Sequence, residues 1–213
     1  MAKQLSAPQV TEMLCEVAQA LIGKVDVLTE ADLATGDGDH GIGMRRGAEA
    51  ALEALGASPD LSVQGAFKQT GMAIMSKTGG AAGAVFGTFF RGGAKAFDEV
   101  DTLTATAFRD FLGQSAAAVS KRGGVEEGAK TMVDAVAWAA RRAAQADGDD
   151  LSEVLSAAER GALEGVEATK EMIATTGKAR SLGERSLGHP DPGAISVSII
   201  LGAMKTYAAG QGD

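Results

Sequence analysis

The chain has 213 residues, a formal net charge of −8 and a pI near 4.9. This acidic balance argues against a nucleic-acid partner, which requires a basic face, and the length suits one well-packed domain over residues 1–213. No apolar run reaches the ~18 residues of a membrane span, no signal peptide is recognisable, and the lone Cys15 fits a reducing compartment, so we expect a cytoplasmic protein.

Apolar residues recur at three- and four-residue steps in most of the chain, which is typical of helices that bury one face. Ser6 is placed to cap the first helix and Asp191 to cap the last. The β-branched run 195–200 also permits a strand, but nothing else in the chain would pair with it. The sequence predicts an all-α chain of eight helices. Five of them lie near residues 6–22, 43–55, 62–76, 104–120 and 151–173, and three more begin after residues 79–80, near Thr131 and at Pro192.

The connection before the second predicted helix holds Asp32, Asp37, Asp39 and His40 among several glycines. Clustered carboxylates repel one another, and glycine loses much backbone entropy on ordering, so an ordinary turn is rarely built this way. Hard oxygen ligands without cysteine favour Mg²⁺, and we interpret the three aspartates as a metal site. For residues 36–39 alone, a solvated turn followed by an N-cap is the alternative. The spacing fits neither a dinucleotide-binding loop, which needs a preceding strand, nor an EF-hand.

Residues 79–83, Gly-Gly-Ala-Ala-Gly, introduce the fourth helix with side chains too small to cover its first N–H groups. Free N–H groups and the helix dipole suit a phosphate. A glycine-rich linker explains this stretch at least as simply, because phosphate loops usually carry more specific patterns. Residues 123–131 nearly spell a P-loop, but no strand precedes them and we treat that likeness as accidental. Thr131 and Met132 can still face a ligand from the start of the sixth helix.

The connection of residues 176–194 is too long for a simple linker and carries three cations, Lys178, Arg180 and Arg185. Long ordered loops of this kind are often functional. If consecutive helices are antiparallel, this loop, the acidic loop and the turns before the fourth and sixth helices are all odd-numbered connections. They therefore lie at one end of the bundle, where the sequence predicts one site built from carboxylates, a glycine-rich phosphate cradle and cations.

Taken together, these motifs resemble the L subunits of dihydroxyacetone kinases, the nucleotide-binding subunits often called DhaL. The likeness covers nearly the whole chain and rests on four motifs in order. They are GDGDHG at residues 36–41, GGA and GTFF at 79–81 and 87–90, KTM at 130–132, and LGERS, GH and DPGA at 182–186, 188–189 and 191–194. The resemblance implies a single-domain, antiparallel eight-helix barrel with ADP or ATP at one end.

By the same resemblance, Asp32, Asp37 and Asp39 hold two Mg²⁺ ions that bridge the nucleotide phosphates. The implied reaction is phosphoryl transfer to a short-chain ketose such as dihydroxyacetone, held by a separate K subunit. It has no certain catalytic residue in this chain, and the metals, Lys178 and Arg180 assist it. The residues expected to line the nucleotide are His40, Gly41, Ile42, Gly43, Ala81, Ala82, Gly123, Thr131, Met132, Lys178, Asp191, Pro192 and Gly193.

Several positions depart from the family pattern, which often has Ser at Ala82, Asn at Gly43, Asp at Ala129 and Arg at Lys178. Lysine lacks the directed donors of arginine, and Arg180 is placed to compensate. The phosphoryl donor stays open between exchangeable ATP and a phosphohistidine protein of the phosphotransferase system that rephosphorylates bound ADP. The alternatives are an ATP-dependent kinase subunit for another acceptor, such as a tetrulose or a fatty acid, and a nucleotide-sensing regulator that binds a transcription factor.

Overall fold

The computed structural model describes residues 2–98 and 100–211, most of which are helical, and it confirms the predicted all-α class. The strands are three residues each, β1 (Gln4–Ser6) and β2 (Thr102–Thr104), paired antiparallel. Two 3₁₀ segments, η1 (Ala94–Phe97) and η2 (Lys178–Ser186), interrupt the connections. The α-helices are α1 (Ala7–Gly23), α2 (Val25–Thr35), α3 (His40–Gly56), α4 (Val63–Lys77), α5 (Gly80–Gly93), α6 (Ala105–Gly123), α7 (Met132–Gln145), α8 (Leu151–Lys170) and α9 (Pro192–Gly210).

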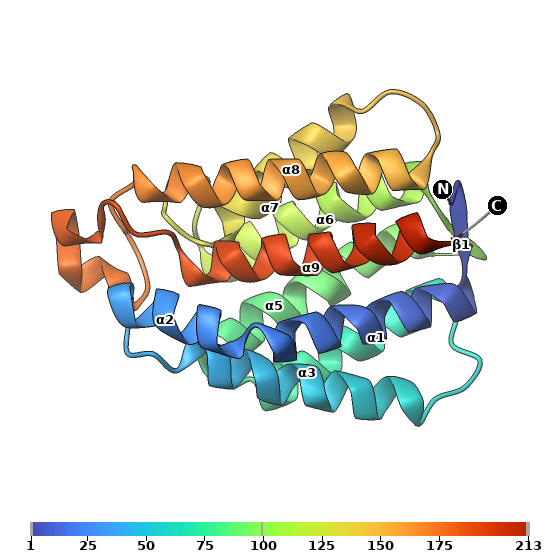
Figure 1. The fold of residues 1–213 in the computed structure, drawn as a ribbon, viewed down its shortest axis with the longest axis horizontal. Helices are drawn as coiled ribbons and strands as arrows, with labels where there is room; N and C mark the ends of the chain where they lie inside the picture. Colours follow the sequence, from blue (N-terminus) through green and yellow to red (C-terminus); the bar gives the residue numbers. More distant parts are fainter. Residues whose placement is uncertain (1, 99, 212–213) are drawn as a thin grey trace.

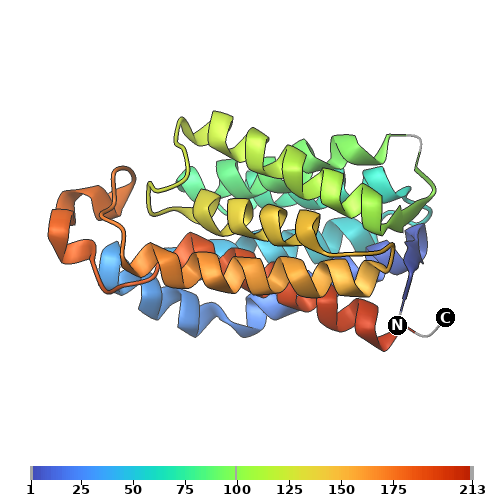
Figure 2. The same ribbon diagram turned by 90° about the horizontal axis from the view of Figure 1, so that it is seen from above.

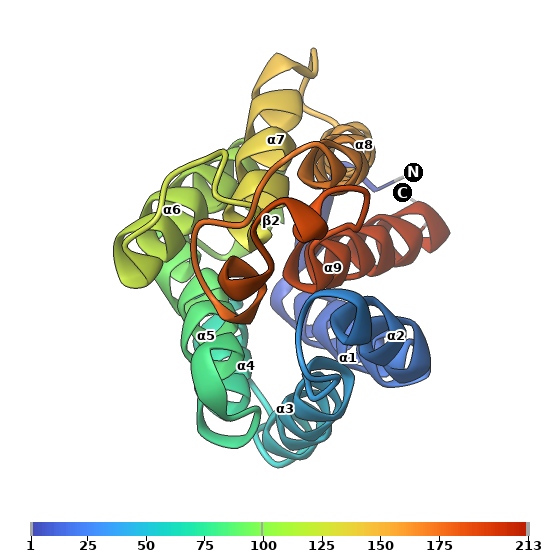
Figure 3. The same cartoon turned by 90° about the vertical axis from the view of Figure 1, so that its left-hand side faces the viewer.

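The helices form a closed ring of antiparallel neighbours (Figures 1 and 3). From α3 to α9 each helix contacts the next one along the chain, and α1 contacts both α3 and α9 and so closes the ring. Because each helix runs the length of the barrel, the connections alternate between its two ends. The barrel expected from the family resemblance is therefore present.

Helix α2 was not predicted, because residues 25–35 were interpreted as part of the acidic connection. The helix follows α1 after a break at Lys24, whose φ of −114° and ψ of 16° are not helical. The two helices lie end to end along one side of the barrel (Figure 1), so together they make one passage along it. The alternation of connections that the sequence predicted consequently holds, even though the described residues contain nine α-helices and not eight.

Three predicted helix bounds also differ from the structure by three residues, and one of them is the end of the helix expected at 104–120, which continues to Gly123. The helix expected at 43–55 begins three residues earlier, at His40, with Asp39 as its N-cap, so the acidic loop is shorter than the sequence predicted. The helix expected at 151–173 ends at Lys170. The run 195–200 is helical, and Asp191 caps α9 as predicted, since its Oδ2 accepts a hydrogen bond from the N–H of Ala194 at 2.8 Å.

Aromatic side chains fill the inside of the barrel, and all seven phenylalanines of the chain are buried. The ring of Phe67 lies 4.8 Å from those of Phe97 and Phe111, and Phe97 stacks on Phe111 at 5.4 Å. Such pairs stabilise beyond the burial of their area. This cluster packs α4, η1 and α6 together. Helix α4 is the helix that leads into the glycine turn before α5.

By length and composition α9 is apolar enough to cross a membrane, with a mean hydropathy of 1.2 over an 18-residue window. It contacts α1, α7 and α8 in the barrel, and 44% of that window is buried. A helix that packs on three neighbours needs apolar residues on several faces. The composition of α9 is therefore explained by its place in the ring.

Close packing of α7 on α8 depends on Gly161, and this predicts opposite effects for two glycine substitutions. A Cβ at Gly161 would lie 2.4 Å from the carbonyl oxygen of Trp138, whereas one at the exposed Gly113 of α6 would meet nothing within 4 Å. Gly161→Ala should lower the free energy of unfolding by about 1–3 kcal/mol, and Gly113→Ala should raise it by up to about 1 kcal/mol. Urea unfolding followed by circular dichroism measures both, and equal effects would contradict the packing described.

Candidate functional site

The four connections singled out from the sequence meet at one end of the barrel, where they surround a cavity of about 380 Å³. Figure 2 shows the long loop with η2 projecting beyond this end, while β1 and both termini lie at the other end. The predicted site residues that line the cavity are Asp32, Asp39, His40, Gly43, Ala81, Ala82, Gly123, Thr131, Met132, Lys178, Asp191, Pro192 and Gly193. The structure thus brings together most of the residues that the sequence predicted for the site.

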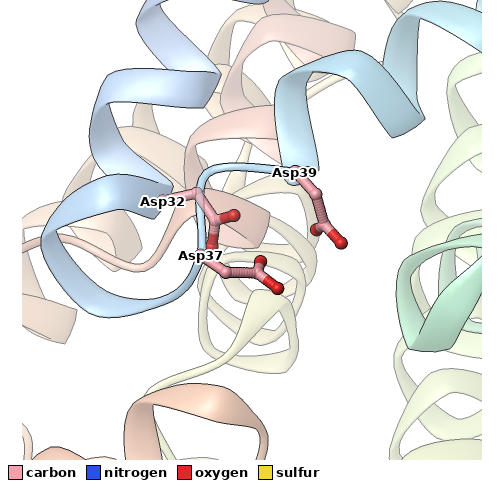
Figure 4. A group of neighbouring side chains, drawn as sticks. All are labelled: Asp32, Asp37 and Asp39. Atoms are coloured by element: carbon pink, nitrogen blue, oxygen red, sulfur yellow. The ribbon is translucent and has the colours of Figure 1, made fainter.

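Asp32, Asp37 and Asp39 form a compact group of carboxylates (Figure 4). One oxygen of each lies within 4.8 Å of the others. Asp32 comes from the last turn of α2 and is buried, and its Oδ2 accepts a hydrogen bond from the backbone N–H of His40 at 3.1 Å. Asp37 and Asp39 are exposed. Three convergent oxygen donors fit a hard divalent cation such as Mg²⁺, which binds through carboxylates and water.

The Lys178 ammonium group lies between two of these carboxylates. It donates a hydrogen bond to Asp37 and a second to Oδ2 of Asp39 at 3.0 Å. The hydrogen bond from Lys178 lowers the pKa of Asp37, and the two carboxylates raise the pKa of Lys178. Both groups are exposed, so water screens the interaction and it adds little to stability. Its significance is positional, because it shows that the long loop reaches the acidic loop from across the cavity.

The histidine of the acidic loop is held inside the protein. Only 9% of His40 is exposed, and its Nε2 lies 2.8 Å from Oγ of Ser196 on α9. Burial lowers the pKa of this imidazole, because removal from water disfavours the charged form. His40 therefore joins the first turn of α3 to α9 as a neutral ring and forms part of the cavity wall.

The glycine turn before α5 supplies an open helix N-terminus. Gly79 and Gly80 have φ of 80° and 56°, values that favour glycine, and a Cβ at Gly80 would meet nothing within 4 Å. Gly79 to Ala82 line the cavity, so the first N–H groups of α5 are placed to meet an anion. Nη2 of Arg46 donates a hydrogen bond to the carbonyl oxygen of Thr78 at 3.1 Å, which fixes the entry to this turn.

Apolar side chains complete the cavity wall beside these polar groups. They come from α5, from the end of α6 and from the connection to α7, and they are Val85, Phe86, Val119, Val125, Met132 and Val133. Thr131 caps α7, and its Oγ1 accepts a hydrogen bond from the N–H of Val133 at 3.2 Å. A cavity with an apolar wall, a helix N-terminus and charged groups can accept a flat apolar ring system linked to phosphates.

The start of α9 closes the remaining side of the cavity. A Cβ at Gly193 would lie 3.2 Å from Cβ of Met132, so glycine permits α9 and α7 to approach here. Burial raises the pKa of Asp191 to about 7 against the hydrogen bond from Ala194, which favours the charged form. Glycine also permits a close approach at Gly43 of α3, because a Cβ there would lie 3.1 Å from the carbonyl oxygen of Thr78.

Four predicted residues do not line the cavity. Asp37 lies beside it and reaches the site through Lys178. Ile42 is 45% exposed, and Arg180 is also exposed on η2. A Cβ at Gly41 would lie 2.3 Å from both Oγ1 of Thr29 and the carbonyl oxygen of Val25, so this glycine permits close packing of α3 on α2.

The cavity residues that the sequence interpretation missed include Arg46, Thr78 and Lys130. Arg46 is three residues after Gly43, so helical spacing already placed it on the same face. Lys130 belongs to the KTM motif. It was not assigned to the site, because the likeness of residues 123–131 to a P-loop was interpreted as accidental. Thr78 was not recognised because its role depends on backbone groups, which sequence patterns do not report.

Comparisons with known proteins identify the family of the chain. A family model described as the DAK2 domain matches residues 34–206. The chain is 36% identical over 199 residues to the PEP-dependent dihydroxyacetone kinase, ADP-binding subunit DhaL, of Escherichia coli K12, covering 92% of this chain and 95% of that protein. It is 37% identical over 178 residues to the PEP-dependent dihydroxyacetone kinase 1, ADP-binding subunit DhaL, of Listeria innocua, covering 84% and 85% respectively. Both relatives are subunits of phosphotransferases, the predicted class of enzyme.

A solved structure shares the fold. The dihydroxyacetone kinase of C. freundii, in complex with AMP-PNP and Mg²⁺, matches with a TM-score of 0.69 and 23% identity over 97% of this chain. The match covers 35% of that protein, so the chain spans about a third of its length. The resemblance inferred from the sequence motifs is confirmed: the chain belongs to the DAK2-domain family, whose members include the DhaL subunits of dihydroxyacetone kinases.

Proposed function

We propose that this chain binds ADP or ATP with two Mg²⁺ ions and is the phosphoryl-transfer subunit of a kinase for dihydroxyacetone or a similar short-chain ketose. The observation that carries the proposal is the group of three carboxylates beside the open N-terminus of α5, in one cavity that also has an apolar wall. The names of the relatives, which are ADP-binding subunits of dihydroxyacetone kinases, support the same function.

In this proposal Asp32, Asp37 and Asp39 hold the metal ions, which neutralise charge on the phosphate oxygens when bound. The N–H groups at the start of α5 would orient the phosphates, and so would the Lys178 ammonium group, which lies beside Asp37 and Asp39. The backbone N–H of His40 keeps the buried Asp32 carboxylate in one orientation. Phosphoryl transfer depends mainly on positioning of the reactants and on neutralisation of the charge on the phosphoryl group, and these residues would supply both.

The acceptor and its partner follow from the exposure of the site. The cavity opens at the end of the barrel, where a second protein can approach it, and the relatives are named as subunits of dihydroxyacetone kinases. We therefore propose that a separate K subunit presents the ketose, that a phosphohistidine protein or exchangeable ATP supplies the phosphoryl group, and that the complex works in the cytoplasm.

The deciding experiment is calorimetric titration of ADP and ATP into dialysed protein with and without Mg²⁺, after mass spectrometry for nucleotide that co-purifies. Tightly retained ADP supports a phosphotransferase-linked subunit, and exchanging ATP supports an ATP-consuming one. Addition of a bacterial K subunit and dihydroxyacetone then tests turnover. Absence of Mg²⁺-dependent nucleotide binding would contradict the proposal, and binding without turnover would favour a nucleotide-sensing regulator.

Removal of one carboxylate from the triad should disable nucleotide binding without unfolding the protein. We expect Asp37→Asn and Asp39→Asn each to raise the Kd for Mg²⁺-ADP by more than about tenfold, because loss of a direct ligand should exceed the effect of an outer-shell change. Asp110→Asn, at an exposed position on α6, is the matched control. Unchanged affinity in both site variants would refute the metal assignment.

His40 should matter less than the aspartates, since its neutral ring forms part of the wall and the metals carry most of the charge. We expect His40→Ala to raise the Kd for Mg²⁺-ADP by a smaller factor than Asp37→Asn does, in the same titration. Thermal unfolding should show a lower Tm, because the ring packs 6.0 Å from that of Phe86. A loss of affinity as large as that of the Asp37 variant would show that the ring contributes directly.

The raised pKa of Asp191 predicts a pH-dependent stability. The unfolded chain releases this proton near pH 3.9, whereas the folded protein keeps it up to about pH 7. Between these values the folded state binds more protons, so the contribution of Asp191 to stability falls as pH rises. Asp191→Asn keeps an acceptor for α9 and should gain stability relative to the wild type from pH 5 to 7.5 in urea unfolding. A difference that does not change with pH would contradict the shift.

A further inference from the structure

Lys130 is a buried cation that the proposed reaction does not use. Only 2% of it is exposed, and its hydrogen-bond partners among the described residues are carbonyl oxygens, although the charges of Asp191, Asp134 and Glu171 also act on it. Its Nζ donates hydrogen bonds to the carbonyl oxygens of Thr169 at 2.5 Å and His189 at 2.6 Å. A lysine is rarely buried without a strong partner, because removing its charge from water is costly. These two carbonyl groups are therefore the partners that compensate for the burial of Lys130.

The two carbonyl groups belong to opposite ends of one loop. Thr169 lies in the last turn of α8, just before the loop begins, and His189 lies just before α9. By holding both, the ammonium group fixes the distance between the start and the end of the loop. Oγ1 of Thr169 also accepts a hydrogen bond from the N–H of Asp191 at 3.0 Å, and the carbonyl of Lys170 accepts one from Gly188 at 2.8 Å.

The backbone beside Lys130 holds the same loop at a third point. The N–H of Thr175 donates a hydrogen bond to the carbonyl oxygen of Ala129 at 3.3 Å. Lys130 itself has a φ of 60°, a left-handed conformation uncommon for residues other than glycine. In this conformation the carbonyl of Ala129 meets the loop at Thr175, while the side chain of Lys130 meets both ends of the loop.

The anchored loop carries two parts of the cavity. Lys178 lies within it and contacts Asp37 and Asp39, and Asp191 to Gly193 follow it and line the cavity beside Met132. Between these points the loop crosses the open end of the barrel (Figure 3). A change at its base would therefore move both parts together.

We propose that Lys130 is a positioning residue for nucleotide binding: its ammonium group ties the two ends of the 171–191 loop together and so places Lys178 and the first turn of α9 around the cavity. This inference rests on the proposed nucleotide function. Two of the three ammonium protons are engaged by backbone carbonyls, so Lys130 acts through the loop and differs in this from a P-loop lysine, which contacts phosphate directly.

The test compares three variants with the wild type in two assays. Lys130→Met keeps the length of the side chain and removes its donors, and Lys130→Arg keeps charge and donors but is larger. Thr169→Val removes the hydroxyl that holds Asp191 and leaves the carbonyl groups in place. Lys68→Met, at an exposed position on α4, is the control. One assay is calorimetric titration of Mg²⁺-ADP, and the other is limited proteolysis by trypsin without nucleotide.

Proteolysis reports on the loop independently of any ligand, because Lys178, Arg180 and Arg185 are exposed on it. Mass spectrometry measures cleavage after these residues. We expect Lys130→Met to be cleaved there about tenfold faster than the wild type and to bind Mg²⁺-ADP about tenfold more weakly. Lys130→Arg should lie closer to the wild type than Lys130→Met in both assays, whereas a role in packing alone predicts the reverse order.

The outcomes separate this inference from the proposed function. If the wild type does not bind Mg²⁺-ADP, the proposed function fails, and the role of Lys130 in nucleotide binding fails with it whatever the proteolysis shows. If the wild type binds and Lys130→Met binds equally well, the inference is overturned and the function stands. If Lys130→Met does not fold, Lys130→Gln decides, because its shorter, neutral side chain cannot hold the carbonyl groups of Thr169 and His189 together: faster loop cleavage with weaker binding supports the inference, and wild-type behaviour overturns it.

Discussion

Mutual repulsion of three carboxylates is the constraint on which the site depends. Asp32, Asp37 and Asp39 place oxygens within 4.8 Å of one another, a distance at which like charges oppose each other unless a cation lies between them. Lys178 supplies one positive charge from the far side of the cavity. The buried Asp32 cannot turn away, because the backbone of His40 holds it. Lys178 therefore offsets part of the repulsion, and a divalent cation bound by the three carboxylates would offset more of it.

The barrel places the acidic loop and three other connections around one cavity. Four connections that are far apart in sequence reach the same end because each helix runs the full length of the ring. Each contributes what its sequence allows: carboxylates from the acidic loop, free N–H groups from the turn at Gly79 and Gly80, apolar side chains around Val125, and a cation from the long loop. No single connection holds all of these groups, and the shared end of the barrel brings them together around one cavity.

The sequence was sufficient for features that depend on period and order. Helical periodicity gave the all-α class, and the alternation of antiparallel helices gave the end at which the site lies. The sequence was insufficient for features that depend on the geometry of the backbone. Gly23 marks the end of α1, but the sequence pattern of residues 25–35 did not reveal that a second helix follows the break at Lys24, and the close packing of α3 on α2 that Gly41 permits was not foreseen. Lys130 could not be interpreted either, because its partners are carbonyl groups of Thr169 and His189, 39 and 59 residues away.

The ends of the described chain lie far from the cavity, and this affects how the domain can be combined with others. The carbonyl oxygen of Ala2 accepts a hydrogen bond from the N–H of Ser152 at the start of α8, and the side chain of Gln211 contacts that of Gln9 near the start of α1. Both points are at the end opposite the long loop (Figure 1). A polypeptide joined at either end would leave the cavity mouth free. The match to the solved kinase covers 35% of that chain, so the same fold occurs there within a longer polypeptide.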